Sequence, residues 1–143
     1  MELVKKIAPL FFVVLLSLIA IKPLFITGFF PMHDDVQVAR VYEMGSALSD
    51  GQFPVRIVEH LGFGYGYPLF NFYAPLPYYV GGFLSLLGID ALIATKIMIG
   101  IGTLIAAVGM YLLARNFYGE LGGMLSAFLY MYAPYHAVQI FVR

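Results

Sequence analysis

The sequence lacks cysteine and has few charged side chains. The absence of cysteine from its 143 residues excludes a disulfide, a thiol nucleophile and a cysteine-ligated zinc site. Only 11% of the residues are charged and 62% are hydrophobic, whereas soluble domains usually carry about a quarter charged residues. A chain of this size cannot hide so much apolar surface in its own interior. We therefore expect lipid to be its solvent.

Histidine is also scarce. The three histidines, His33, His60 and His136, lie far apart and form no metal-ligand motif at helical spacing. Acidic and basic residues balance to a formal net charge of zero, which argues against nucleic acid as a partner. Membrane lipids are the expected partner, and the expected fold is an all-α, polytopic membrane protein.

Long apolar segments predict three transmembrane helices. The first covers residues 1–30, where Lys5 and Lys6 precede the apolar run and favour a cytoplasmic N-terminus. Residues 92–114 and 119–135 form the second and third predicted spans. A cleaved signal peptide is the alternative for the first segment, but no small-residue cleavage site follows it.

Residues 31–91 are expected to form an outer loop with two helices on the membrane surface. The first helix, residues 36–49, separates apolar from polar residues as interfacial helices do. The second, residues 74–88, would reach only about 22 Å, short of the ~30 Å hydrocarbon core, so we expect it to be interfacial or re-entrant. If it crossed instead, Arg115 would lie outside, against the preference for cytoplasmic positive charge. The apolar side of residues 36–49 comprises Val38, Val41, Tyr42, Gly45 and Leu48, and the other side carries Gln37, Arg40, Glu43 and Ser46.

Two adjacent carboxylates, Asp34 and Asp35, follow the first span and are the strongest candidates for chemistry. Ionised carboxylates at the rim of a membrane are costly unless they meet water, a cation or a ligand. A carboxylate can take a proton from an attacking hydroxyl as general base, and carboxylate oxygens are preferred ligands of Mg²⁺ and Mn²⁺. The alternative is that one aspartate caps the helix at residues 36–49 and the other is solvated.

Two arginines of the outer loop, Arg40 and Arg56, are candidates for phosphate binding, because a planar guanidinium matches phosphate well. Contact with lipid headgroups is the alternative for both, and an ion pair between Arg40 and Glu43 on one helix is another. Eight aromatic residues lie between positions 63 and 79. They form either an interfacial aromatic belt or platforms for sugar rings.

Several motifs resemble a bacterial membrane-protein family labelled "6-pyruvoyl-tetrahydropterin synthase-related". They are the acidic pair after the first span, GQFPVR at 51–56, GYGYPLFNFYAPL at 64–76 and APYHAVQIFVR at 133–143. Despite its label, that family is similar to the GT-C superfamily of membrane glycosyltransferases. The resemblance covers residues 30–143, and the glycine–tyrosine–proline run is its most specific part.

The resemblance implies a chemistry and a set of site residues. GT-C enzymes take a sugar from a polyprenyl phosphate on the outer face of the membrane. An acidic residue after the first span acts as base or binds the metal, which maps onto Asp34 or Asp35. Arg40 and Arg56 would hold phosphate, and the family's cytoplasmic turn matches RNFYG at 115–119. The implied sugar site is lined by Tyr65, Tyr67 and Asn71, and Arg143 matches a family arginine that stands ahead of further sequence.

The expected protein is therefore a multi-pass protein of the bacterial plasma membrane that transfers a sugar from a lipid-linked donor. Mg²⁺ or Mn²⁺ is its expected cofactor if the acidic pair binds metal. The sequence is expected to be the N-terminal part of a longer chain and to be inactive without the remainder. A transporter component for a lipid or solute is one alternative, although only Lys22 and Lys96 lie near the predicted spans and neither has an acidic partner there. A non-catalytic membrane scaffold is the other.

Overall fold

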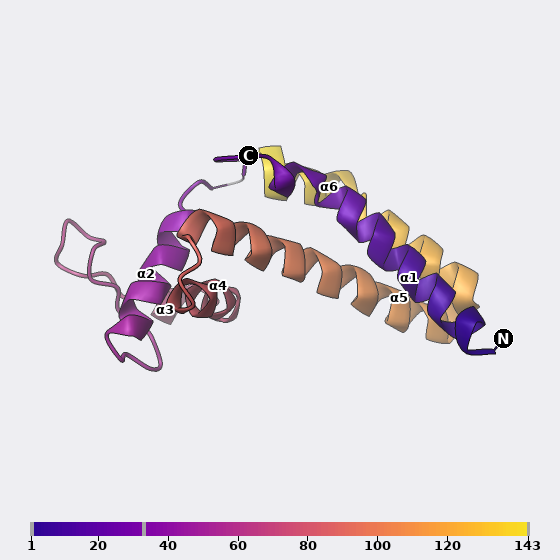
Figure 1. Cartoon of the computed structure of the whole chain (residues 1–143), viewed down its shortest axis with the longest axis horizontal. Coiled ribbons are helices and arrows are strands. Elements are labelled where there is room, and N and C mark those ends of the chain that lie inside the picture. The colour runs from indigo at the N-terminus through magenta and orange to yellow at the C-terminus, as the bar shows by residue number, and fades with distance from the viewer. Residues whose placement is uncertain (1, 33, 143) are drawn as a thin grey trace. The chain divides into compact units, whose positions relative to one another are not determined.

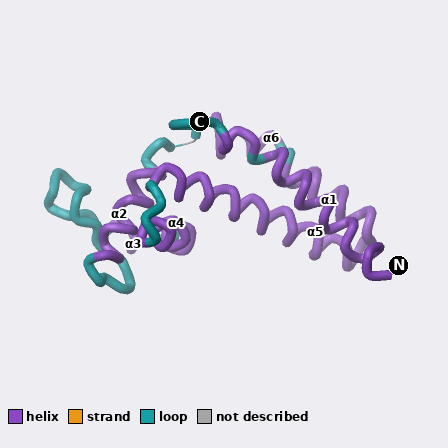
Figure 2. Tube along the Cα trace, in the orientation of Figure 1, coloured by secondary structure: helices purple, strands orange, loops and turns teal. Residues whose placement is uncertain are grey.

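The computed structural model describes residues 2–32 and 34–142, and these residues form helices joined by loops (Figure 2). The described residues contain no strand, and one isolated antiparallel bridge joins Val58 to Tyr67. The all-α prediction is confirmed. The chain divides into two compact units, and each is described by itself. We call residues 2–32 with 100–142 the hairpin unit, and residues 34–99 the α2–α4 unit.

The first helix of the hairpin unit, α1, runs from Glu2 to Ala20. It is followed by a 3₁₀ turn, η1, over Lys22–Phe25. Pro23 lies in the first positions of η1, and proline cannot continue an α-helix because its ring clashes with the preceding turn. The helix in the first predicted span therefore ends well before residue 30. Lys22 is exposed in the turn that follows it.

The longest helix, α5 (Ala91–Met131), is broken at Gly119. Gly119 has φ 71° and ψ −173°, a backbone conformation that is essentially restricted to glycine. A hydrogen bond joins the two sides of this break: the hydroxyl of Tyr111, before it, donates to the carboxylate of Glu120, after it. Gly123 lies against Tyr111, since a Cβ atom there would be 3.0 Å from that ring. The two arms of α5 therefore fold back on each other, at the position where a turn over residues 115–119 was expected.

Among the described residues, the stretch Ala91–His136, taken across the break, is the one that is long and apolar enough to cross a membrane. The helix Ala8–Ala20 is apolar but shorter. After α5 come a short helix, α6 (Pro134–Ala137), and a π-helical turn, η2 (Val138–Val142).

The hairpin unit has a small core to which α1 and both arms of α5 contribute. Figure 1 shows α1 beside the returning arm of α5. The Ser17 hydroxyl of α1 donates to the Val13 carbonyl at 2.8 Å and lies 3.1 Å from the Met131 sulfur. Large apolar side chains on the other faces of α1 and α5 are exposed. The buried residues of this core are Val13, Ala107, Tyr111, Ala127 and Met131.

The α2–α4 unit is built on α2 (Gln37–Ser49) and α4 (Leu76–Leu86), with a short helix α3 (Leu69–Phe72) between them in sequence (Figure 1). The two helices of the expected outer loop are thus present. They approach closely because Gly81 faces Val41, and a Cβ atom at Gly81 would lie only 2.8 Å from a Val41 methyl group. The 11 residues of α4 reach about 16 Å, too short to cross a hydrocarbon core.

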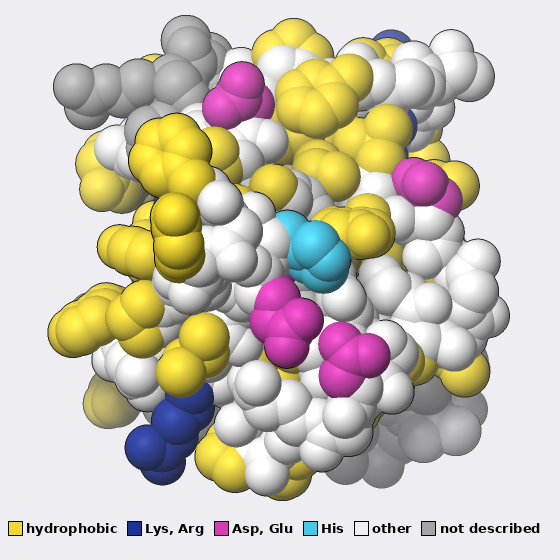
Figure 3. All heavy atoms as spheres, turned by 90° about the vertical axis from the view of Figure 1, so that its left-hand side faces the viewer, with side chains coloured by type: hydrophobic (Ala, Val, Ile, Leu, Met, Phe, Trp, Pro, Cys, Tyr) yellow, Lys and Arg dark blue, Asp and Glu magenta, His cyan; other side chains and the backbone are white. Residues whose placement is uncertain are grey.

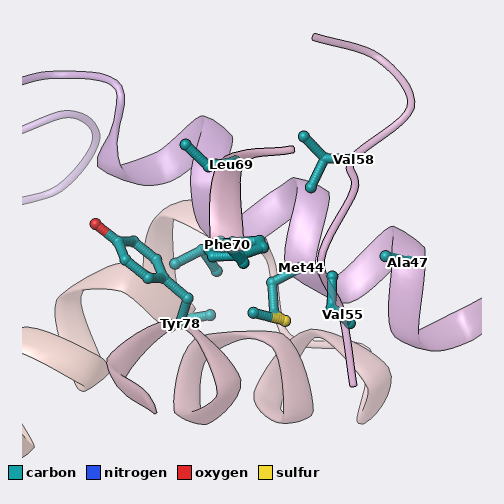
Figure 4. Close-up of a cluster of buried hydrophobic side chains, with 9 residues drawn as sticks. Met44, Ala47, Val55, Val58, Leu69, Phe70 and Tyr78 are labelled. Carbon is teal, nitrogen blue, oxygen red and sulfur yellow. The ribbon is translucent and has the colours of Figure 1, made fainter. Parts of the chain in front are cut away.

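The core of this unit differs from the stripe predicted for α2. Val41 and Gly45 of that stripe are buried within the unit, whereas Val38 is half-buried and Tyr42 exposed. Met44 and Ala47, which were not assigned to the stripe, are buried as well. The reason is that α4 covers one side of α2 while the loop through Val55 and Val58 covers the next side, so the buried face is rotated. Figure 4 shows Met44 between Tyr78 of α4 and Val55 of that loop. The buried residues of the core are Val41, Met44, Ala47, Val55, Val58, Leu69, Phe70, Tyr78 and Ala94.

Candidate functional site

Asp34 and Arg40 form an ion pair at the beginning of α2. The carboxylate oxygen Oδ2 of Asp34 lies 3.2 Å from Nη2 of Arg40. Asp34 has φ 60°, in the left-handed region that aspartate tolerates better than most residues and that occurs often at functional sites. The N-cap of α2 is Val36, and no side chain caps this helix. The alternative of an aspartate cap is therefore wrong, because the Asp34 carboxylate bonds to Arg40 instead.

The guanidinium of Arg40 is held by aromatic and amide side chains from three parts of the unit. It lies over the ring of Tyr73, 4.1 Å from the ring centroid. Its Nη1 is 3.4 Å from the Tyr78 hydroxyl and 3.4 Å from Oε1 of Gln37. The Tyr78 hydroxyl donates to the same Gln37 oxygen at 2.5 Å. The Arg40 side chain is 13% exposed and that of Asp34 is 35% exposed, so a fixed cation lies beside a carboxylate that water can reach.

These contacts shift the pKa values of Arg40 and Tyr78, whose side chains face each other. Burial alone would lower the pKa of Arg40, but its hydrogen bond with Tyr78 and the nearby tyrosine oxygens outweigh burial and leave this pKa raised. Burial raises the pKa of Tyr78, Arg40 opposes that change, and Asp34 adds to it. Arg40 therefore stays charged, and Tyr78 stays a neutral hydrogen-bond donor.

The two aspartates of the acidic pair are separated by their surroundings. Asp34 faces Arg40, whereas Asp35 is exposed. Their neighbour His33 lies outside the described residues. Within residues 2–32 and 34–142, no group of three or more histidine, aspartate or glutamate side chains is close enough to hold a metal ion. Metal binding at Asp34 and Asp35 stays a prediction that rests on two carboxylates.

A second polar pair, Glu43 with His60, was missed by the sequence analysis. Glu43 was assigned to the polar side of α2, yet its side chain is 4% exposed. Its Oε1 lies 3.2 Å from Nδ1 of His60, and its Oε2 accepts the His60 backbone N–H at 3.3 Å. The expected alternative of an Arg40–Glu43 pair is wrong, because Arg40 bonds to Asp34 and Glu43 to His60.

The remaining predicted site residues lie on exposed parts of the α2–α4 unit. Tyr67 pairs with Val58 through two backbone hydrogen bonds of 2.8 and 3.0 Å, which close the glycine-rich loop at its base. Tyr65 lies near the loop tip and is 94% exposed, and Tyr67 is 48% exposed. Asn71 on α3 and Arg56 before the loop are exposed as well. In the described part of the chain none of these four residues bonds to Asp34 or Arg40, and Arg143 lies outside it.

A shallow hollow lies beside the buried Glu43. Figure 3 shows the face on which a histidine side chain lies next to acidic side chains, with apolar side chains around them. The His60 side chain is 56% exposed, so water can approach its ring, while that of its partner Glu43 is 4% exposed. The hollow is lined by Glu43, Ser46, Ala47, Asp50, Gln52 and Glu59.

Comparison of the chain with protein-family models, with curated proteins and with solved structures finds no match. A functional assignment must therefore come from the chemistry of the site. That site consists of two polar pairs that α2 contributes to, a half-buried cation that lies over an aromatic ring, and an exposed aromatic loop.

Proposed function

We propose that this protein is a membrane glycosyltransferase, similar to the GT-C superfamily, that transfers a sugar from a polyprenyl phosphate on the extracytoplasmic face. The observation that carries the proposal is the Asp34–Arg40 ion pair, in which the guanidinium also lies over the ring of Tyr73. A guanidinium held by stacking and hydrogen bonds presents a fixed positive charge, which suits a phosphate group. The half-exposed carboxylate beside it is available as a base or as a ligand for Mg²⁺ or Mn²⁺.

In the proposed reaction an acceptor hydroxyl attacks the anomeric carbon of the donor sugar. The bond between that carbon and the phosphate oxygen breaks, and its electron pair leaves with the polyprenyl phosphate. Arg40 would offset the negative charge of this leaving group. A donor phosphate at Arg40 would also compete with Asp34 for the guanidinium and release the carboxylate for its own role.

The aromatic loop supports the sugar side of the proposal. No charged residue occurs between Leu61 and Ile89, and the rings of Tyr65 and Tyr67 are exposed. Exposed aromatic faces can stack on the apolar faces of sugar rings, and tyrosine hydroxyls can bond to sugar hydroxyls. Tyr65, Tyr67 and Asn71 are the residues proposed to contact the sugar, with Arg56 as a second phosphate contact.

The proposal includes three spans in the bacterial plasma membrane, formed by α1 and the two arms of α5, with a cytoplasmic N-terminus. Exposed apolar side chains on these helices support it, and the position of Arg115 near the break at Gly119 favours a cytoplasmic turn. A membrane-impermeant thiol reagent should label Phe63→Cys from outside intact cells and Phe117→Cys only after the cells are opened. Labelling of Phe117→Cys from outside would contradict this orientation.

Substitution of the acidic pair tests the chemistry. Membranes with the full-length protein are supplied with radiolabelled hexoses on undecaprenyl phosphate, and transfer to membrane acceptors is counted. Asp34→Asn or Asp35→Asn should lower transfer at least about a hundredfold, the usual contribution of a general base, without loss of protein from the membrane. Asp90→Asn is the matched control, because Asp90 bonds to the Leu92 backbone N–H and asparagine keeps such a cap. Full transfer by both variants would contradict the proposal, and solute uptake by proteoliposomes would favour a transporter.

A further inference from the structure

We propose that Glu43 and His60 form the proton-accepting pair for the acceptor hydroxyl, with His60 as the base and Glu43 as its positioning residue. This inference rests on the proposed function. It assigns to the α2–α4 unit a second site, built on a buried carboxylate that the sequence alone placed on an exposed side of a helix.

The geometry is that of a carboxylate that orients an imidazole. Both Glu43 oxygens face His60: Oε1 lies 3.2 Å from Nδ1, and Oε2 lies 3.4 Å from Nδ1 and accepts the backbone N–H at 3.3 Å. The Glu43 side chain is 4% exposed and the His60 side chain 56% exposed. The carboxylate therefore has its hydrogen-bond partners inside the protein, while the ring it holds faces water.

This arrangement fixes which ring nitrogen is available. A carboxylate only accepts hydrogen bonds, so a neutral His60 must carry its proton on Nδ1 to donate to Glu43. Its Nε2 then has a free lone pair, and Nε2 has no hydrogen-bond partner among the described residues. Histidine is the side chain that gains and loses a proton near neutral pH, and a carboxylate on the far nitrogen stabilises the imidazolium that forms.

Among the described residues, an aromatic ring lies near His60 and two further carboxylates line the hollow beside Glu43. The ring of Tyr42 lies 5.9 Å from the His60 ring, centroid to centroid. Asp50 and Glu59 line the same hollow as Glu43. Arg40 lies three residues before Glu43 on α2, and residues at this spacing are neighbours on a helix surface. A cation suited to phosphate and the carboxylate that orients the proposed base thus follow each other along one helix.

The proposed step balances in atoms and charge. The O–H bond of the acceptor breaks and its proton moves to Nε2 of His60. The acceptor oxygen forms a bond to the anomeric carbon, and the bond from that carbon to the phosphate oxygen breaks with its electron pair. The imidazolium then gives its proton to water. On this assignment Asp34, which pairs with Arg40 in this structure, would keep only the other role proposed for it, that of a ligand for Mg²⁺ or Mn²⁺. Nε2 of His60 is open to an incoming hydroxyl.

The test uses the full-length protein with the undecaprenyl-phosphate hexoses described above and measures transfer between pH 5 and 8. His60→Gln should lose about a hundredfold in transfer and should change the dependence of transfer on pH, because the glutamine side chain cannot accept the proton. Glu43→Gln keeps an oxygen that can accept from Nδ1 and should retain more transfer than Glu43→Leu. Glu59→Gln, a neighbouring carboxylate without a bond to the ring, is the matched control and should behave as wild type.

A readout without substrate accompanies this assay. Nitrogen NMR of histidine-labelled protein at pH 8 should show His60 with its proton on Nδ1 in wild type and in Glu43→Gln, and a mixture of tautomers in Glu43→Leu.

Three results would overturn the inference, and they can be distinguished. If His60→Gln transferred sugar at the wild-type rate and with the wild-type dependence on pH, His60 would not be the base. The proposed function would still stand. If the NMR spectrum of the wild type showed the proton of neutral His60 on Nε2, Glu43 would not orient the ring as proposed. Absence of transfer from every hexose donor by wild type would overturn the proposed function, and this inference with it.

Discussion

The two units of this chain differ in the size of their buried cores and in the number of charged side chains that they hold against partners. In the hairpin unit, large apolar side chains of α1 and α5 are exposed and the buried core is small. In the α2–α4 unit, six of the eight acidic residues of the chain are found, and two of them, Asp34 and Glu43, are held by Arg40 and His60. A unit that turns apolar groups outward is suited to lipid. A unit that orders charged groups against partners is suited to chemistry.

Glycine shows the same contrast. Gly81 lies at the contact between α4 and α2, where even a methyl group would meet Val41. Gly102 and Gly109 on α5 face open space, with no atom within 4 Å of an added Cβ. Gly119 is needed for its backbone angles rather than for space. Replacement of these residues by alanine should therefore affect the two units by different mechanisms.

The largest effect is expected at the break in the hairpin unit. Gly119→Ala forces a Cβ atom into a conformation essentially restricted to glycine and should destabilise the folded protein by about 2–3 kcal/mol. Thermal unfolding of the purified protein in detergent should show a lower midpoint. Gly109→Ala is the control, because it adds a methyl group to open helical surface. Equal midpoints for Gly119→Ala and Gly109→Ala would contradict the role assigned to the break.

A smaller effect is expected at the contact between α2 and α4. Gly81→Ala places a Cβ atom 2.8 Å from a methyl group of Val41, a buried β-branched residue with little freedom to rotate. Overpacking of this kind costs about 1–3 kcal/mol, and the better helix propensity of alanine returns up to ~1 kcal/mol. A net loss of about 1–2 kcal/mol should appear in the same unfolding measurement.

The control for this contact is Gly102→Ala. It gains the better helix propensity of alanine, but its added Cβ atom has no atom within 4 Å. It should unfold at the wild-type midpoint or slightly above it. If Gly81→Ala were as stable as Gly102→Ala, the two helices would not be packed as closely as described.

Much of the fold follows from the sequence because its determinants are local. The apolar run before Lys22 predicts a helix, although the span was expected to reach residue 30 and the helix ends at Ala20, before Pro23. The turn expected at RNFYG, on the resemblance and on the position of Arg115, is found as the break at Gly119. The site was less predictable because burial depends on long-range contacts. Nothing near Glu43 in the sequence indicates that the segment through His60 covers it, and nothing near Arg40 indicates that Tyr73 and Tyr78 hold its guanidinium.

The central claim is that the half-buried Arg40, beside Asp34, binds the phosphate of a polyprenyl donor. The most direct test measures the affinity of the full-length protein in detergent for undecaprenyl phosphate, with Arg40→Gln compared with Arg56→Gln. Loss of a charge-assisted contact is worth about 1.5–3 kcal/mol, so Arg40→Gln should weaken binding at least about tenfold. The exposed Arg56 should matter less. Wild-type affinity in Arg40→Gln would contradict the account.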